Sequence, residues 1–198
     1  MTSRRLTLAR HGETDHNLAG RLNGDPAIPV HLTEQGRAQA RALGRALAGA
    51  AFDLAVRTRF PRTGETLAIV LDGRDVPVVT CPDLDDIALG DCEGRPVAEY
   101  RAWRRAHGPA ERLPGGGESR LDALRRYLRG YERLLASPAR RVLAILHEIP
   151  IRFLANAVRE VDPLATPLQQ VPNAMPYEYE DEDLLRAFEV MRERVRRG

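Results

Sequence analysis

The sequence predicts an α/β fold of three layers, with a mostly parallel central sheet and helices on both of its faces. Three observations support this. Short apolar runs alternate with longer amphipathic segments along the chain. Residues 142–146 are all apolar, which is typical of a strand buried on both faces. His11 and His147, two of the five histidines, each lie at the end of such a run.

In the first half of the chain, predicted strands alternate with predicted helices. The strands are the short runs at residues 6–9, 53–57 and 76–80. The helices are the amphipathic segments at residues 33–50 and 62–71. Thr33 is a suitable N-cap for the longer helix, because its hydroxyl can accept a hydrogen bond from a first-turn amide.

The second half contains a glycine-rich loop at residues 114–117. This loop separates a segment rich in tryptophan and arginine from a long helix, a strand and a shorter helix. We expect these elements at residues 97–107, 119–136, 141–146 and from Pro150 onward. Residues 184–190 fit either an edge strand or a helix.

The composition suits one domain over residues 1–198, since 43% of the residues are hydrophobic and a sizeable core is possible. The 30 basic residues nearly balance the 28 acidic ones, for a net charge of +2. The arginines alternate with acids and leucines on the predicted helices, which is typical of solvated faces. We therefore expect no nucleic-acid partner.

The two cysteines, Cys81 and Cys92, suggest neither a disulfide framework nor a zinc site. The N-terminal apolar stretch is too short for a signal peptide, and no run approaches the roughly 18 apolar residues of a membrane span. These features predict a cytoplasmic protein without a membrane partner.

Ligands of parallel α/β sheets bind beyond the carboxyl ends of the strands, where His11 and His147 are expected to meet. A phosphoryl group at this place would need positioned cations, a nucleophile and a proton donor. Arginine can hold two phosphoryl oxygens, and a neutral imidazole can form a labile phosphoimidazole. A single histidine at a strand end usually has an ordinary structural role, but two such histidines, with Arg10 beside one, indicate a site.

Residues 8–14, Leu-Ala-Arg-His-Gly-Glu-Thr, resemble the signature of the histidine phosphatase superfamily, which includes the cofactor-dependent phosphoglycerate mutases. The similarity continues in the family's order over roughly residues 6–175. Its blocks include Asn17 and Gly24, then residues 32–40, 58–66, 84–94, 116–119, 142–152 and 171–174. The resemblance implies a phosphoglycerate mutase-like fold.

The resemblance also implies roles for individual residues. His11 would be the nucleophile that becomes phosphorylated, and His147 would donate to a phosphoryl oxygen. Arg10 and Arg62 would bind the phosphoryl oxygens. Asp86 occupies the place of the family's glutamate proton donor.

Further residues are implied to lie at the substrate. Asn17, Thr14 and Gly24 would contact the phosphoryl group or its surroundings, and Glu118 would border the pocket. The family uses neither a metal nor an organic cofactor for hydrolysis, and a small variable cap is expected at residues 95–118. A small phosphorylated substrate is the expected partner, and a homodimer is an open alternative to a monomer.

Two departures from the family pattern affect the chemistry. Asp86 is one methylene shorter than glutamate, which sets its carboxyl back by about 1 to 1.5 Å, and the adjacent Asp85 could compete for its role. Two neighbouring carboxylates would also raise each other's pKa. Glu148 stands where glycine is common, and it should weaken phosphate binding unless it points away or pairs with an arginine such as Arg152.

The predicted function is a phosphomonoesterase that works through a phosphohistidine on His11. A phosphoglycerate-type mutase is the first alternative. The resemblance favours hydrolysis, because mutase members of the family usually have a larger insertion than residues 100–118. A catalytically weak regulatory or binding member is the second alternative. Trp103 and its neighbours Arg101, Arg104 and Arg105 could line the substrate mouth, or could belong to an ordinary amphipathic helix.

Overall fold

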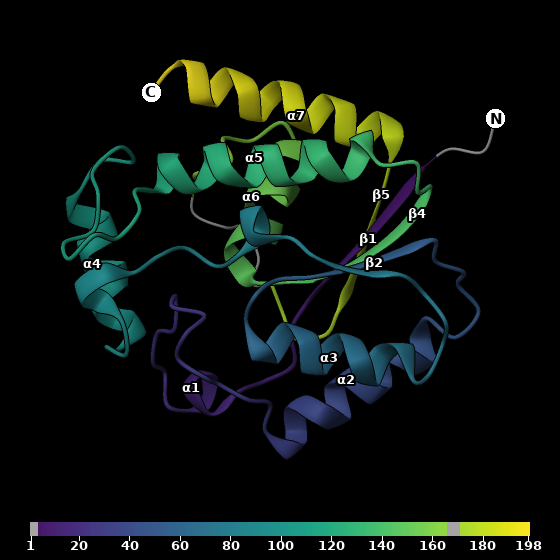
Figure 1. Cartoon of the computed structure of the whole chain (residues 1–198). Coiled ribbons are helices and arrows are strands. Elements are labelled where there is room, and N and C mark those ends of the chain that lie inside the picture. The colour runs from purple at the N-terminus through teal and green to yellow at the C-terminus, as the bar shows by residue number, and fades with distance from the viewer. Residues whose placement is uncertain (1–3, 166–170) are drawn as a thin grey trace.

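The computed structural model describes residues 4–165 and 171–198, and a five-stranded sheet lies at its centre (Figure 1). The strands follow the order β3-β2-β4-β1-β5. Four strands are parallel to their neighbours, and β5 runs antiparallel to β1. Their bounds are β1 (Arg5–Arg10), β2 (Leu54–Arg57), β3 (Val78–Thr80), β4 (Arg141–Leu146) and β5 (Pro176–Glu180).

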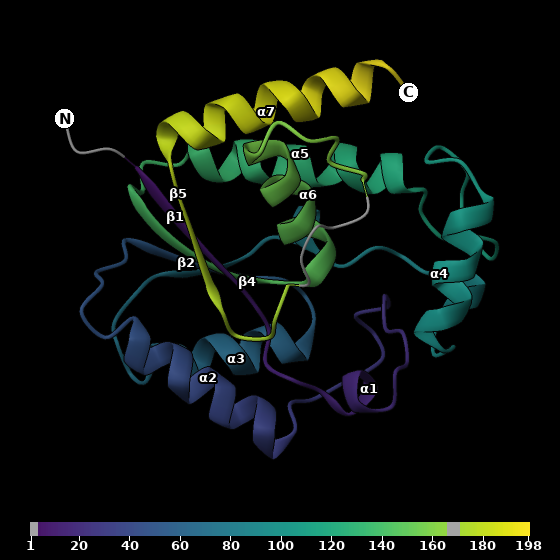
Figure 2. The same ribbon diagram turned by 180° about the vertical axis from the view of Figure 1, so that it is seen from behind.

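Helices cover both faces of this sheet, which confirms the predicted three-layer α/β architecture (Figures 1 and 2). One face is covered by α2 (Glu34–Ala46) and α3 (Pro61–Leu71). The other is covered by α5 (Arg120–Ala136), α6 (Glu148–Val158) and α7 (Asp181–Arg196). The short helix α1 (Asp15–Leu18) and α4 (Val97–Ala106) lie apart from these layers.

The alternation of side chains along β4 divides the core into two clusters. Val142, Ala144 and Leu146 join the cluster beneath α5, α6 and α7. Leu143 and Ile145 point the other way and join the cluster beneath α2 and α3. Because both faces of the strand are buried, its sequence is apolar without interruption.

The C-terminal region differs most from the sequence prediction. Residues 184–190, left open between strand and helix, belong to α7. The preceding strand β5 was not predicted, because its sequence, Pro-Tyr-Glu-Tyr-Glu, is half exposed and rich in acids. It is an edge strand, and its pairing with β1 comes from residues far away in the chain. None of the described helices is long and apolar enough to cross a membrane.

The loop after β1 packs tightly against the first turn of α2, and two glycines make this approach possible. A Cβ atom at Gly12 would lie 2.4 Å from the carbonyl oxygen of Gly36, and a Cβ atom at Gly36 would lie 2.1 Å from the carbonyl oxygen of Glu13. Thr33 caps α2 by accepting from the Gly36 amide at 2.9 Å, as predicted. The backbone that carries His11 is thereby fixed on the end of a helix.

The variant Gly36→Ala should destabilise the fold by about 1–3 kcal/mol, because the new methyl group must push the loop after β1 away from α2. Urea unfolding followed by circular dichroism measures this loss. Gly49→Ala is the matched control, since a Cβ atom at Gly49 meets nothing within 4 Å. Equal stability of the two variants would contradict the close approach.

Candidate active site

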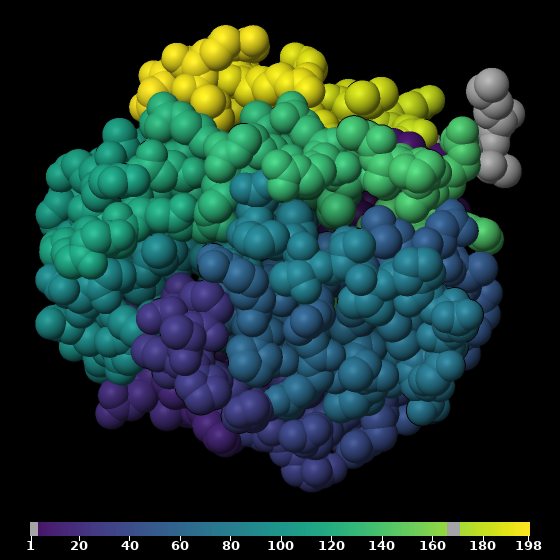
Figure 3. Space-filling model, in the orientation of Figure 1, coloured from purple at the N-terminus to yellow at the C-terminus, as the bar shows by residue number. Residues whose placement is uncertain are grey.

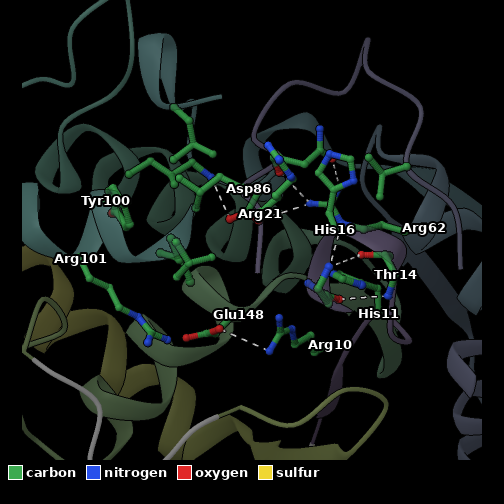
Figure 4. Close-up of a pocket in the computed structure, with 18 of the residues that line it drawn as sticks. Arg10, His11, Thr14, His16, Arg21, Arg62, Asp86, Tyr100, Arg101 and Glu148 are labelled. Carbon is green, nitrogen blue, oxygen red and sulfur yellow. Dashed lines mark hydrogen bonds and ion pairs between the residues drawn. The ribbon is translucent and has the colours of Figure 1, made fainter. Parts of the chain in front are cut away.

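A pocket of about 430 Å³ opens at the carboxyl ends of β1 and β4 (Figure 4). His11 directly follows β1, and Glu148 lies one residue beyond His147, which follows β4. The loop around α1 and the helix α4 supply the walls, and their surfaces lie near one another in Figure 3. The cavity therefore lies where parallel α/β sheets generally bind their ligands.

His11 is 3% exposed, and its two ring nitrogens have different partners. Nδ1 lies 2.7 Å from the carbonyl oxygen of Gly12, so this nitrogen carries the hydrogen and donates it. Nε2 accepts a hydrogen bond from Nε of Arg62 at 3.1 Å and has a lone pair. Burial lowers the pKa of His11 well below its usual value, and the charges of Arg62 and Arg10 lower it further. The ring is thus a neutral imidazole with Nε2 directed into the site.

His147 is fully buried, and its ring centre lies 5.5 Å from that of His11. Its Nδ1 accepts from Nη2 of Arg62 at 3.1 Å, and its Nε2 lies 2.9 Å from Oγ1 of Thr58. An arginine can only donate, so the ring hydrogen is on Nε2. Burial and then the charge of Arg62 lower the pKa of His147 well below its usual value. Donation from Nδ1 to a phosphoryl oxygen therefore requires this ring to take up a proton when the anion binds.

Arg62 connects the groups of the site from the first turn of α3. Besides its bonds to both histidines, it contacts Asp86 at 3.4 Å and donates to the carbonyl oxygen of Asn23 at 3.1 Å. Its Nη1 also donates to the side-chain oxygen of Asn23. Burial lowers the pKa of Arg62 to about 10, so the guanidinium stays charged at neutral pH.

Asp86 and Asp85 point in different directions, and only Asp86 lines the pocket. Its Oδ2 lies 3.4 Å from Nη2 of Arg62 and 3.6 Å from Nδ1 of His147. Asp85 instead accepts from the amide and Nε of Arg59, at 2.9 and 2.5 Å. The geometry thus favours Asp86 as the proton donor of the pair.

Burial is the main cause that raises the pKa of Asp86, and the charge of Arg62 opposes it. Asp85, which is paired with Arg59, is not among the main causes of this shift, so the raised pKa of Asp86 is explained mainly by burial. A raised pKa suits a proton donor, since it increases the protonated fraction near neutral pH.

Arg10 and Glu148 form an ion pair on the opposite side of the pocket (Figure 4). Oε2 of Glu148 lies 3.3 Å from Nη1 of Arg10, and its Oε1 lies 3.3 Å from Nη1 of Arg152. Arg10 also donates to the carbonyl oxygen of Val171 at 2.9 Å. The carboxylate that departs from the family pattern is thus paired with arginines, one of the two arrangements expected from the sequence.

The helix α4 presents arginines to the same pocket. Arg101, Arg104 and Arg105 are among its lining residues. Trp103 does not line it, but stacks on His107 with a centroid distance of 4.3 Å and packs against the core. Both interpretations of this segment are therefore right in part: the arginines face the cavity, and the tryptophan anchors the helix.

The remaining predicted site residues divide into two groups. Thr14 and Asn17 line the pocket and form the capping box of α1. Gly24 and Glu118 do not line it, but lie in a neighbouring hollow beyond the segment of Asp86. The Gly24 amide donates to Glu93 at 2.7 Å. Glu118 is paired with Arg126.

Several residues that orient the histidines had no role in the sequence prediction. Thr58 contacts His147, Thr66 accepts from the Gly12 amide at 3.0 Å, and Asn173 donates to the carbonyl oxygen of His11 at 2.7 Å. Thr58 directly follows β2, so its place at a strand end was a usable signal. Among the residues that the structure describes, no three His, Cys, Asp or Glu side chains are grouped to hold a metal ion.

Two neutral imidazoles beside the buried guanidinium of Arg62 and the partly exposed one of Arg10, at the carboxyl edge of a parallel sheet, suit the binding and transfer of a phosphoryl group. A family model described as "Histidine phosphatase superfamily (branch 1)" matches residues 6–186. The chain belongs to this superfamily, as its sequence motifs predicted.

Known relatives include both mutases and phosphatases. The chain is 31% identical to 2,3-bisphosphoglycerate-dependent phosphoglycerate mutase 2 of Gloeobacter violaceus, over 88% of this chain and 84% of the relative. It is 36% identical to adenosylcobalamin/alpha-ribazole phosphatase of Salmonella typhimurium, over 73% and 74%. The crystal structure of the alpha-ribazole phosphatase from Shigella flexneri superposes with a TM-score of 0.78 at 27% identity, covering 88% of this chain and 89% of that one. Phosphatase or mutase activity is supported by these similarities.

NMR of the histidine side chains should find different tautomers in the ligand-free protein. We expect a hydrogen on Nδ1 of His11 and on Nε2 of His147, and titration of both rings below pH 6.5, because burial and Arg62 disfavour the charged forms. Bound vanadate should raise the pKa of His147, since an anion favours the imidazolium. Titration at or above pH 6.5 in the ligand-free protein would contradict the assignment.

Proposed function

We propose that the protein is a phosphomonoesterase that transfers the phosphoryl group of a small ester to His11 and then to water. The observation that carries this proposal is the unprotonated Nε2 of His11. The ring hydrogen of His11 is held on Nδ1 by the Gly12 carbonyl, and the lone pair of Nε2 accepts from Arg62 until a phosphoryl oxygen takes over that donor. A neutral imidazole so fixed is a suitable nucleophile near pH 7.

In the first step Nε2 of His11 attacks phosphorus, a P–N bond forms, and the P–O bond to the leaving group breaks. Asp86 supplies the proton to the leaving oxygen, which departs as an alcohol. Arg10 and Arg62 hold the non-reacting oxygens, and His147, protonated when the dianion binds, donates to one of them. The positive charges of the guanidinium groups and of the imidazolium stabilise the negative charge of the transition state. Neither step calls on a metal or cofactor.

In the second step a water molecule attacks the phosphohistidine. The Asp86 carboxylate left by the first step accepts the proton of this water, so that the P–N bond breaks and inorganic phosphate leaves. His11 returns to its neutral form and Asp86 to its protonated form. The two steps balance without any further reactant.

Mutase activity is the second candidate, because the pocket has more cationic groups than one phosphoryl group requires. Arg101, Arg104 and Arg105 face the cavity, and they would suit a substrate with a further anionic group. Hydrolysis is favoured because residues 100–118 are shorter than the insertion that mutase members of the superfamily usually have at this place. A catalytically weak binding role is the least favoured, since the site holds both histidines and both predicted phosphoryl-binding arginines.

The expected cytoplasmic location remains a proposal.

Incubation of the protein with a phosphate donor, followed by acid treatment, should reveal an acid-labile phosphohistidine. His11→Ala should lose this label and at least about 10³-fold of kcat/KM, because covalent catalysis is removed. His16→Ala is the control, a histidine that lines the pocket without a proposed catalytic role. Unchanged activity in His11→Ala would end the mechanism.

Assays of phosphate release and of phosphoglycerate isomer conversion, run on the same preparation, distinguish the two candidate activities. We expect phosphate release from a generic ester to exceed isomer conversion. Isomer conversion faster than phosphate release would instead favour the mutase.

Glu148→Gly should raise kcat/KM on an aryl phosphate and lower the inhibition constant of inorganic phosphate, because a carboxylate is removed from Arg10. We expect a change of about 5- to 10-fold, equivalent to about 1–1.4 kcal/mol. Glu148→Gln gives the same test without a change in backbone freedom, and the exposed Glu189→Gln is the control. No gain in either Glu148 variant would show that Glu148 does not compete with the phosphoryl group for Arg10.

A further inference from the structure

The segment that carries Asp86 is held from behind by one arginine of α5. Arg126 donates to the carbonyl oxygens of Asp83 at 3.1 Å, Asp85 at 2.9 Å and Asp86 at 3.1 Å. One guanidinium thus binds three main-chain acceptors within four residues. Because its side chain is only 16% exposed, water competes little for these bonds.

Glu118 completes this arrangement from the chain just before α5. It accepts from Nε and Nη2 of Arg126, at 2.8 and 2.6 Å, in a two-point ion pair. Its Oε2 also accepts from the amide of Ala88 at 3.0 Å. The main chain is therefore held on both sides of the Asp86 side chain. Arg126 binds the carbonyl oxygens of Asp85 and Asp86, and Glu118 binds the amide of Ala88.

The same segment also packs directly against α5. The short 3₁₀ helix η1 (Pro82–Leu84) lies on the helix at Gly130, where a Cβ atom would be 2.8 Å from Cγ of Leu84. Arg129 and Arg133 pair with Asp83, at 3.6 and 3.0 Å. The backbone before Asp86 is thus fixed on a rigid element of the fold.

We propose that the Arg126–Glu118 pair is a positioning device for the proton donor Asp86, an inference that rests on the proposed function. Neither residue lines the pocket of His11, so neither touches the reacting atoms. An aspartate reaches less far than a glutamate, by about 1 to 1.5 Å, and its backbone must be held correspondingly close. The pair sets the backbone from which the Asp86 carboxyl reaches Arg62 and His147.

The test uses two esters that differ in their need for a proton donor. The 4-nitrophenolate group leaves readily without a proton, whereas an alcohol such as glycerol needs one. Arg126→Met should lower kcat/KM for glycerol phosphate about 10- to 100-fold, within the range that a general acid contributes. It should lower kcat/KM for 4-nitrophenyl phosphate less than about 3-fold, because Arg126 contacts neither the nucleophile nor its arginines. The charge of Arg126 also lowers the pKa of His147, but burial, Arg62, His11 and Arg10 have larger effects on that ring.

Combination with Asp86→Asn separates positioning from a general loss of structure. In the Asp86→Asn background, Arg126→Met should reduce kcat/KM for glycerol phosphate by less than about 2-fold, because the donor is already absent. Glu118→Gln should reproduce the substrate selectivity of the loss in a weaker form, and it provides the test if Arg126→Met does not fold. The exposed Arg125→Met, an α5 arginine paired with Asp122, is the matched control and should leave both rates unchanged.

Equal losses on both esters, or multiplicative losses in the double variant, would overturn the positioning role. Those results would leave the phosphatase mechanism intact, because the wild-type protein would still hydrolyse both esters and form the phosphohistidine. A wild-type protein that does neither would instead refute the proposed function, and the positioning role with it.

Discussion

The site depends on one buried cation placed between two imidazoles. Arg62 donates to Nε2 of His11 and to Nδ1 of His147, and its charge disfavours the protonated form of both rings. Burial disfavours its own charge and lowers its pKa to about 10, and ionised Asp86 would oppose this effect. A phosphoryl dianion that enters this site binds the guanidinium of Arg62. Its negative charge also favours the protonated form of His147. The protonation state of the nucleophile His11 and the binding of the anion therefore both depend on Arg62.

The two carboxylates of the pocket have opposite effects on an incoming anion. Asp86 is buried, and its raised pKa favours a neutral acid that can donate. Glu148 is a third exposed and is paired with Arg10 and Arg152, so it reduces the positive field on the side of Arg10. The arginines of α4 add positive charge to the lining of the same cavity. This division of charge within one cavity is a basis for discrimination between phosphate esters.

Much of the fold could be predicted because its signals are local. The apolar run of β4 and the capping threonine of α2 each define an element within a few residues. The edge strand β5 escaped prediction because its pairing with β1 is a contact across about 170 residues, and its own sequence is polar. Glu118 was expected at the substrate, but its partner Arg126 directs it to the back of the Asp86 segment.

The sequence by itself indicated the kinds of groups at the site, because histidines that end parallel strands lie along the same edge of the sheet. Their contact follows from the pairing of β1 with β4. It also identified the family through motifs in a fixed order. Only the tertiary structure decided which of Asp85 and Asp86 faces the cavity, which ring nitrogens have hydrogens, and where Glu148 and Glu118 find their partners. Those choices depend on hydrogen bonds and burial between segments distant along the chain, which local patterns do not encode.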